Sequence, residues 1–249
     1  MKKLVGFLLV LFFSFHFLSA PVLGLAPREE TAVSFNWAGY VAAEGVFTGV
    51  SASWVIAAPQ SSDTFGVDAA WVGIGGVSSH DLIQAGTQTI VDYNGNVFYE
   101  AFYEVLPDVS RPLDISVAEG DSVTVSVNQE SPGQWLIFFK NNTSAETFSL
   151  SLAYDSSLSS AEWITEAPSG RRSLLPLNDF GKIQFKDAAA VKNGKITNIE
   201  ESGARLISMA NFAGELLTDV SSLGNDGASF TVSRTDKKVH VFRPRFLNF

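Results

Sequence analysis

The stretch SVTVSVNQESPGQWLIFF, residues 122–139, alternates apolar and polar residues on both sides of a Pro-Gly turn. Successive side chains of an extended chain point to opposite sides, so Val123, Val125 and Val127 share one face. The hydroxyl residues between them share the other face. This period of two predicts half-buried antiparallel strands joined by a tight turn.

The same alternation continues along the chain. Phe148 and Leu150 repeat it, and turn-forming pairs such as Asn94-Gly95 and Asn193-Gly194 separate the segments. No helices of the kind that connect parallel strands are indicated between them. We therefore predict an all-β fold in one domain, a sandwich or barrel of antiparallel strands. Residues 204–217 also fit an amphipathic helix, but strands are favoured there.

Composition removes several classes of function. The 249-residue chain has a formal charge of −9, so binding to phosphates gains nothing from counterion release, and we expect no nucleic-acid partner. It has no cysteine, which excludes disulfides, thiolate nucleophiles and Cys-ligated metals. Three histidines, His16, His80 and His240, leave little for a histidine metal site or a catalytic triad. No GxSxG, HExxH, Walker or EF-hand pattern occurs, so we expect neither a metal nor a cofactor.

The amino-terminal end has the layout of a secretory signal peptide. Lys2 and Lys3 precede an apolar run from Leu4 to Leu18, and small and turn-forming residues follow. The alternative is a membrane anchor retained through residues 4–25, because this stretch is long enough to span a bilayer. We expect a secreted monomer that meets a membrane only if this segment is retained.

These signals divide the chain into four parts. They are a signal peptide or anchor at 1–24, a short leader or propeptide-like segment at 25–33, the folded domain at 34–233, and a basic strand or tail at 234–249. The tail is basic on an otherwise acidic protein, which is compatible with an edge strand around Val239 and Val241.

Five segments place carboxylates and amides among bulky aromatic residues. They are NWAGY at 36–40, WVGIGG at 71–76, LIQAGT at 82–87, YEAFYEVLP at 99–107 and AEWITEAPS at 161–169. Any one of them alone is more often core than binding site. Together and in this order they resemble the glutamic peptidases (eqolisins, peptidase family G1), in particular cysteine-free prokaryotic members. The resemblance covers residues 34 to 232.

The resemblance implies a fold and an activity. The fold is an antiparallel, lectin-like β-sandwich of two bent sheets with a cleft on the concave face. The activity is that of a secreted acid endopeptidase acting on polypeptides. Its catalytic pair falls on Gln84 and Glu166, with the glutamate as general base and then acid on water and the glutamine as donor to the oxyanion. Glu162 is the rival base, because residues four apart on a strand point to the same face.

The resemblance also implies a set of substrate-binding residues, which are Trp37, Trp71, Glu100, Phe102 and Glu104. Two positions depart from the fungal members of the family. Gly75 and Gln88 stand where those members have acids, so fewer carboxylates surround the pair and a less acidic pH optimum is expected.

Two other functions fit the same residues. A carbohydrate-binding or glycoside-hydrolysing sandwich also combines tryptophans with paired carboxylates, and a glycosidase would need two carboxyl groups about 5–9.5 Å apart. A non-catalytic adhesion module would need only the polar strands and the Asn141-Asn142-Thr143 sequon. The peptidase hypothesis differs from both because it requires Gln84 and Glu166 to face one cleft.

Overall fold

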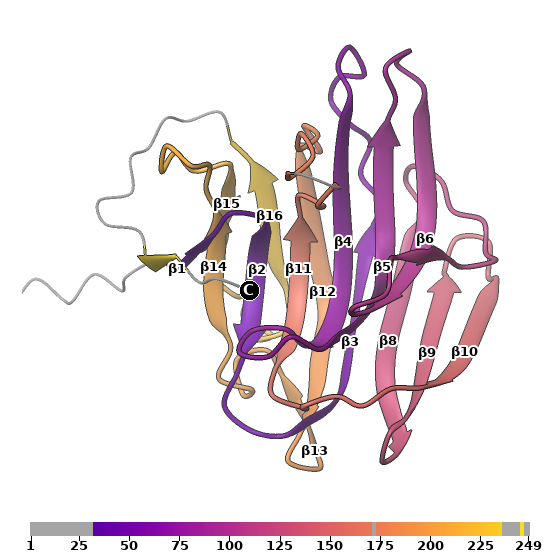
Figure 1. The fold of residues 1–249 in the computed structure, drawn as a ribbon, viewed down its shortest axis with the longest axis vertical. Coiled ribbons are helices and arrows are strands. Elements are labelled where there is room, and N and C mark those ends of the chain that lie inside the picture. The colour runs from indigo at the N-terminus through magenta and orange to yellow at the C-terminus, as the bar shows by residue number, and fades with distance from the viewer. Residues whose placement is uncertain (1–31, 171–172, 236–244, 247–249) are drawn as a thin grey trace, which may run out of the picture.

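The computed structural model describes residues 32–170, 173–235 and 245–246 (Figure 1). These residues form 17 strands and no helix, and accordingly no helical segment capable of crossing a membrane is found among them. The predicted signal peptide and most of the predicted leader and tail, including Val239 and Val241, lie outside the described residues.

The strands form two sheets that pack face to face (Figure 1). The nine-stranded sheet has the order β17 (Arg245–Phe246), β1 (Ala32–Ser34), β14 (Arg205–Met209), β2 (Trp37–Ala42), β11 (Ala161–Glu166), β4 (Gly66–Gly75), β5 (Leu82–Val91), β6 (Val97–Val105) and β7 (Arg111–Pro112). The eight-stranded sheet has the order β10 (Thr147–Ala153), β9 (Gln134–Asn141), β8 (Ser122–Ser131), β3 (Phe47–Val55), β12 (Lys182–Lys192), β16 (Phe230–Arg234) and β15 (Thr218–Val220), with β13 (Lys195–Asn198) paired to β12.

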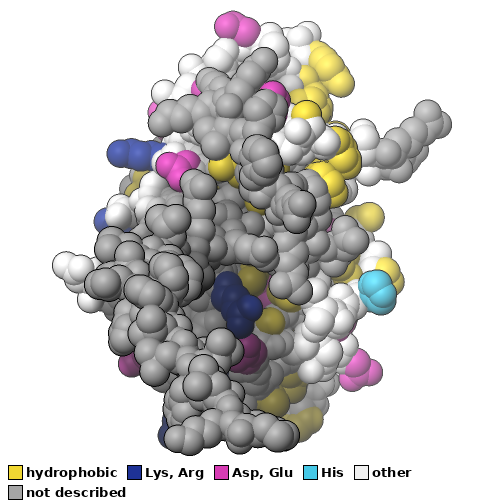
Figure 2. Space-filling view, turned by 90° about the vertical axis from the view of Figure 1, so that its left-hand side faces the viewer, with side chains coloured by type: hydrophobic (Ala, Val, Ile, Leu, Met, Phe, Trp, Pro, Cys, Tyr) yellow, Lys and Arg dark blue, Asp and Glu magenta, His cyan; other side chains and the backbone are white. Residues whose placement is uncertain are grey.

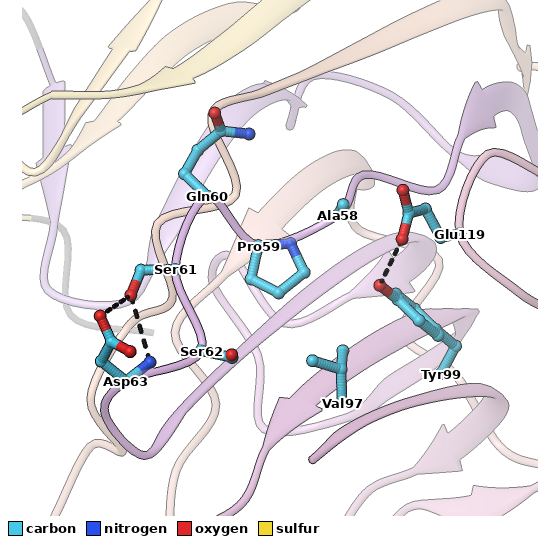
Figure 3. Close-up of a pocket in the computed structure, with 9 residues that line it drawn as sticks. All are labelled: Ala58, Pro59, Gln60, Ser61, Ser62, Asp63, Val97, Tyr99 and Glu119. Atoms are coloured by element: carbon cyan, nitrogen blue, oxygen red, sulfur yellow. Dashed lines mark hydrogen bonds between the residues drawn. The ribbon is translucent and has the colours of Figure 1, made fainter. Parts of the chain in front are cut away.

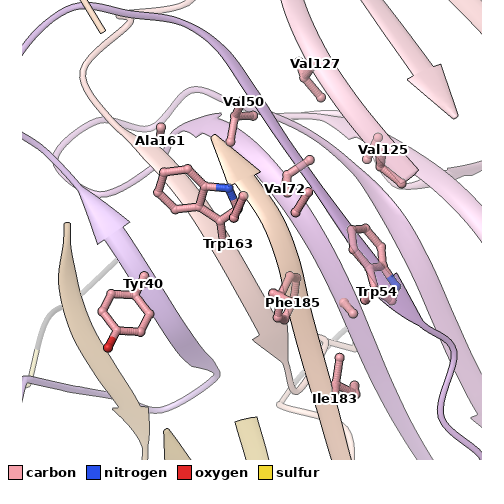
Figure 4. Close-up of a cluster of buried hydrophobic side chains, with 14 of the residues drawn as sticks. Tyr40, Val50, Trp54, Val72, Val125, Val127, Ala161, Trp163, Ile183 and Phe185 are labelled. Atoms are coloured by element: carbon pink, nitrogen blue, oxygen red, sulfur yellow. The ribbon is translucent and has the colours of Figure 1, made fainter. Parts of the chain in front are cut away.

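The main core lies between the two sheets (Figure 4). Trp163 from β11 and Trp54 from β3 are both buried, and Phe185 from β12 stacks on Phe230 with ring centroids 4.8 Å apart. The Trp163 indole nitrogen donates to the Ser51 carbonyl oxygen at 2.9 Å, which satisfies its polar group inside the core. Without disulfides, burial of this apolar surface is the main force that holds the sheets together.

A second, smaller apolar cluster lies on the outer face of the nine-stranded sheet. Its buried members are Trp37, Val41, Ala69, Trp71, Leu82, Phe102, Ile164 and Ile207. All of them except Ile207, which has the same parity as Met209 of the main core, belong to the opposite parity from the residues of their strands that face that core, as the alternation of side chains along a strand requires. This outer face carries the polar residues singled out from the sequence.

The fold prediction is confirmed. The stretch at 122–139 forms β8 and most of β9, joined by Pro132-Gly133. Strand β14 and the turn after it occupy the region where a helix at 204–217 was the alternative. One detail differs from an all-antiparallel sandwich, because β1 pairs in parallel with both β14 and β17. That pairing joins the two ends of the described chain, which alternation within a single strand does not reveal.

One carboxyl is buried on the inner side of the nine-stranded sheet. Asp68 is 3% exposed and accepts a hydrogen bond of 2.8 Å from the Asn178 side-chain amide, which also donates to the Thr89 carbonyl oxygen. Burial raises the pKa of Asp68 to about 7, against a smaller lowering by Asn178. The folded protein therefore binds this proton more tightly than the unfolded chain does.

We predict that Asp68 makes the fold less stable as pH rises from about 4 to about 7. In that range the unfolded chain has lost a proton that the folded chain still holds, so raising the pH favours unfolding. A shift of this size corresponds to a loss on the order of 4 kcal/mol. Thermal unfolding of wild type and Asp68→Asn at pH 4 and pH 7.5 tests this, because the variant should lose less stability over the interval. Equal losses in both proteins would contradict it.

Candidate active site

The candidate residues lie on the outer face of four neighbouring strands, β11, β4, β5 and β6. Strand pairing arranges them in rows that cross the sheet. One row, here called the Gln84 row, contains Glu162, Gly73, Gln84 and Glu104. Another, the Glu166 row, contains Trp37, Glu166, Ala69, Gln88 and Glu100. Between these two rows lies a row made of Ile164, Trp71, Gly86 and Phe102.

Glu166 is the last residue of β11 and is half-buried. Its Oε2 accepts a hydrogen bond of 2.7 Å from the Trp71 indole nitrogen, and its Oε1 accepts one of 3.2 Å from the Asn36 side-chain amide. Burial raises the pKa of Glu166 to about 7. The negative charge of Glu104 adds to this rise, while the donors on Trp71 and Asn36 oppose it. A carboxyl with this pKa can both accept and return a proton near neutral pH.

Gln84 lies in the middle of β5 and is 3% exposed. Its Nε2 donates to Glu104 Oε2 at 2.5 Å, and its Oε1 has no hydrogen-bond partner among the described residues. Burial raises the pKa of Glu104, although the hydrogen bond from Gln84 opposes the rise. Glu104 therefore fixes the orientation of the Gln84 amide, and a second N–H of that amide remains to donate elsewhere.

The outer face brings Gln84 and Glu166 to the same side of the sheet, with β4 between their strands. They are offset by four residues along the strands, which is about 13 Å on a flat sheet, and by two strand spacings, about 10 Å. Among the described residues neither bonds to the other. The charge of Glu104 nevertheless raises the pKa of Glu166, so the carboxyl paired with Gln84 lies within electrostatic range of Glu166.

Glu162, the rival base, occupies a different environment. It is 0% exposed, and both of its carboxyl oxygens lack a hydrogen-bond partner among the described residues. Burial raises its pKa well above the usual range, the charge of Asp81 adds to the rise, and the nearby Ser160 hydroxyl opposes it. Glu162 shares the Gln84 row, but burial disfavours its charged form and leaves it no access to solvent.

The aromatic residues expected to bind substrate are buried. Trp37 is 4%, Trp71 0% and Phe102 4% exposed, and the Trp37 and Trp71 rings meet edge to face with centroids 5.0 Å apart. A Cβ at Gly86 would lie 2.6 Å from Trp71 Cβ and 2.1 Å from the Ala70 carbonyl oxygen, so only glycine lets Trp71 sit there. These rings are therefore packed beneath the outer face next to Glu166 and do not form an exposed wall.

The structure adds two residues to which no role was assigned from the sequence. Asn36 donates to Glu166, although it lies in a segment that the sequence singled out. Asp81 Oδ2 lies 2.9 Å from the position of a Cβ on Gly75, so a carboxylate stands next to this glycine. Four hydrogen bonds from serines lower the pKa of Asp81 and outweigh its partial burial.

Gln88 and Glu100, the other polar residues of the Glu166 row, bond to each other: the Gln88 side-chain amide donates to Glu100 Oε2. Glu100 therefore lies on the candidate face but is paired with Gln88, not with Gln84 or Glu166.

Two pockets lie away from this face. One, of about 540 Å³, is lined by residues 58–63, Val97, Tyr99 and Glu119 (Figure 3). Tyr99 donates to Glu119 at 3.5 Å and points to the opposite side of β6 from Glu100. The other, of about 500 Å³, lies on the eight-stranded sheet beside Lys182 and Lys186. Neither contains the candidate pair. In the part of the chain that the structure describes, no group of three or more His, Asp or Glu residues is placed to hold a metal ion.

Comparison with known proteins identifies the family. The model of the Peptidase A4 family matches residues 35–233. Aspergillopepsin-2 of Aspergillus niger is 30% identical over 231 residues, 82% of this chain and 80% of that protein. Scytalidopepsin B of Scytalidium lignicola is 28% identical over 186 residues, 70% of each chain.

Solved structures agree with this assignment. The crystal structure of aspergilloglutamic peptidase from Aspergillus niger has a TM-score of 0.61 at 28% identity, over 68% of this chain and 99% of that one. Scytalido-glutamic peptidase with a peptide-based transition state analog has a TM-score of 0.68 at 26% identity, over 82% of this chain and 100% of that one. This chain therefore belongs to the Peptidase A4 family, the glutamic peptidases that its sequence resembles, and it is a glutamic endopeptidase.

Proposed function

We propose that this endopeptidase hydrolyses polypeptides with Glu166 as general base and acid and Gln84 as donor to the oxyanion. The observation that carries the proposal is the environment of Glu166. This carboxyl is half-buried, held by two donors and has a pKa of about 7, on the same face as an amide anchored by Glu104. Scytalido-glutamic peptidase has been solved with a peptide-based transition state analog, which supports a polypeptide substrate here.

The reaction needs only these two side chains and a water molecule. The Glu166 carboxylate removes a proton from water as the water oxygen attacks the peptide carbonyl carbon. The carbonyl oxygen becomes an oxyanion and accepts a hydrogen bond from the Gln84 amide. Glu166 then returns the proton to the amide nitrogen as the carbon–nitrogen bond breaks, which leaves a new carboxyl and a new amine. Gln84 changes no protonation state, in keeping with its buried and neutral side chain.

The raised pKa of Glu166 modifies the pH range expected for activity. A base with a pKa near 7 is mostly protonated at pH 4, so attack by water slows as the solution becomes more acidic. We therefore propose that this endopeptidase works best near pH 7, well above the acid range that the resemblance implies. A carbohydrate-cleaving sandwich gains no separate support, because the matching family and both relatives are peptidases.

We expect Glu166→Gln to lower kcat/KM for a protein substrate by about 10²–10⁴-fold, because the base is removed while the shape is kept. Gln84→Ala should lower it by about 10²–10³-fold, since one oxyanion donor is lost. Peptide release from denatured casein measures both effects.

The matched controls are Glu162→Gln and Gln88→Ala. Burial disfavours the charged form of Glu162, and Gln88 bonds Glu100 rather than the proposed pair, so each variant should keep activity within about threefold of wild type. If Glu162→Gln is inactive and Glu166→Gln is active, Glu162 is the base and the assignment is wrong.

The pH profile provides an independent prediction. The rising limb of kcat/KM should have its midpoint near pH 7 and fall about tenfold per pH unit below it, because that limb follows ionisation of Glu166 in the free enzyme. Glu162→Gln should leave the midpoint in place. Steady-state kinetics on one peptide between pH 3 and pH 8 measures both, and a midpoint near 4 would show that an ordinary exposed carboxyl is the base.

We also propose that the enzyme is secreted, with residues 1–24 as a signal peptide. The support is the sequence layout of two lysines, an apolar run and small residues. The mass of the protein recovered from the culture medium tests this: the mature chain should begin near residue 25, and a full-length chain found only in membranes would identify an anchor.

A further inference from the structure

The exposed aromatic rings of this protein are unevenly placed. Among the described residues only three aromatic side chains are largely exposed: Tyr93 at 87%, Phe98 at 53% and Phe212 at 83%. All five tryptophans, in contrast, lie within the described residues and none is exposed. Single exposed rings are ordinary, but several that surround one site indicate binding.

Two of the three rings lie on the outer face next to the Glu166 row. Strand pairing places Val67, Ile90 and Phe98 in one row, two residues beyond Ala69, Gln88 and Glu100. Phe65 and Tyr93 stack at the end of the same ladder, with centroids 4.6 Å apart and planes 12° from parallel. We call Ile90, Phe98 and the stacked pair Phe65–Tyr93 the apolar shelf. Val67 is 4% exposed and lies buried beside it.

The third ring lies on the other flank of Glu166. Phe212 follows β14 and packs on Phe35, with centroids 4.5 Å apart. Phe35 directly precedes Asn36, which bonds Glu166. In Figure 2 the right-hand edge corresponds to the outer face of the nine-stranded sheet, and hydrophobic side chains gather toward its top, where β11 ends and β4 begins. Exposed aromatic surface therefore borders the Glu166 end of the face on both sides.

We propose that the apolar shelf is a substrate subsite that binds a bulky apolar side chain of the polypeptide. This inference rests on the proposed role of Glu166. The shelf row lies about 7 Å from the Glu166 row, which is two residues of an extended chain. A polypeptide cleaved at Glu166 would therefore place on the shelf a side chain at least two residues from the cleaved bond.

The chemistry of the shelf favours an apolar occupant. Its members offer aromatic faces and an aliphatic side chain, and no member carries a formal charge. The neighbouring carboxylate of Glu100 is already bonded to Gln88, and that of Asp92 is bonded to Asn94 and Asn96, so neither needs a cationic partner. Burial of an aliphatic or aromatic side chain on such a surface is favourable without any change in charge.

The test compares wild type with Phe98→Ser and Tyr93→Ser on a peptide library analysed by mass spectrometry. Both residues are exposed, so neither substitution disturbs the core. The matched control is Ile196→Ser, an equally exposed apolar residue at 81% on the β12–β13 hairpin. Wild type and control should prefer Phe, Tyr, Leu or Met at one position at least two residues from the cleaved bond.

The shelf variants should lose that preference. For a peptide with Phe at the position, kcat/KM should fall by about tenfold, the equivalent of one buried apolar contact, and for the same peptide with Ser it should stay unchanged. Active variants with an unaltered preference would overturn the subsite. An equal loss on both peptides would overturn it as well. Activity retained by the Glu166→Gln variant would instead refute the proposed function. The failure of the subsite and the failure of the proposed function are therefore distinguishable.

Discussion

The hydrogen bond from the Trp71 indole to Glu166 is the interaction on which the site depends. Trp71 is fully buried, lies over Gly86 and meets the edge of Trp37, so its nitrogen has one position. It holds a carboxyl at the end of a strand where water has partial access. Burial alone would raise the pKa of such a group further, as it does at Glu162. The donors from Trp71 and Asn36 return the pKa of Glu166 to about 7, where proton exchange is useful.

The same face shows how chemistry can proceed without cysteine or a catalytic histidine. The amide of Gln84 and the carboxyls of Glu104 and Glu166 differ in protonation behaviour because their surroundings differ, although two of them are the same residue type. The amide is anchored by one carboxyl and shares its face with the other, so the proposed base and the proposed oxyanion donor remain separate groups. This separation is what a water-attack mechanism requires. For the same reason, neither Gln84 nor Glu166 needs a metal ion in the proposed reaction.

Much of this arrangement could be predicted from the sequence. Alternation at 122–139 and elsewhere specified strands, because side-chain direction in a strand depends only on neighbouring residues. The same rule placed Glu162 and Glu166 on one face. The distinction between these two carboxyls depended on long-range contacts, since Asn36 and Trp71 reach Glu166 from residues 130 and 95 positions away. The burial of Trp37 and Trp71, the pairing of Asp68 with Asn178 and the parallel pairing of β1 are also properties of the assembled sheets.

Strand β4 contributes to the site because it has only small side chains where it crosses the two polar rows. Where its residues cross the two polar rows it presents Ala69 and Gly73, so nothing bulky stands between the carboxyls of β11 and the amides of β5. A Cβ at Gly73 would already lie 2.9 Å from the Trp71 ring and 3.2 Å from Gln84 Cβ. This strand is therefore a spacer whose side-chain volume sets the separation of acid and amide. The spacing of acid and amide within each row is therefore open to adjustment at positions that carry no reactive group, whereas Trp71 of the same strand stands on the diagonal between Glu166 and Gln84.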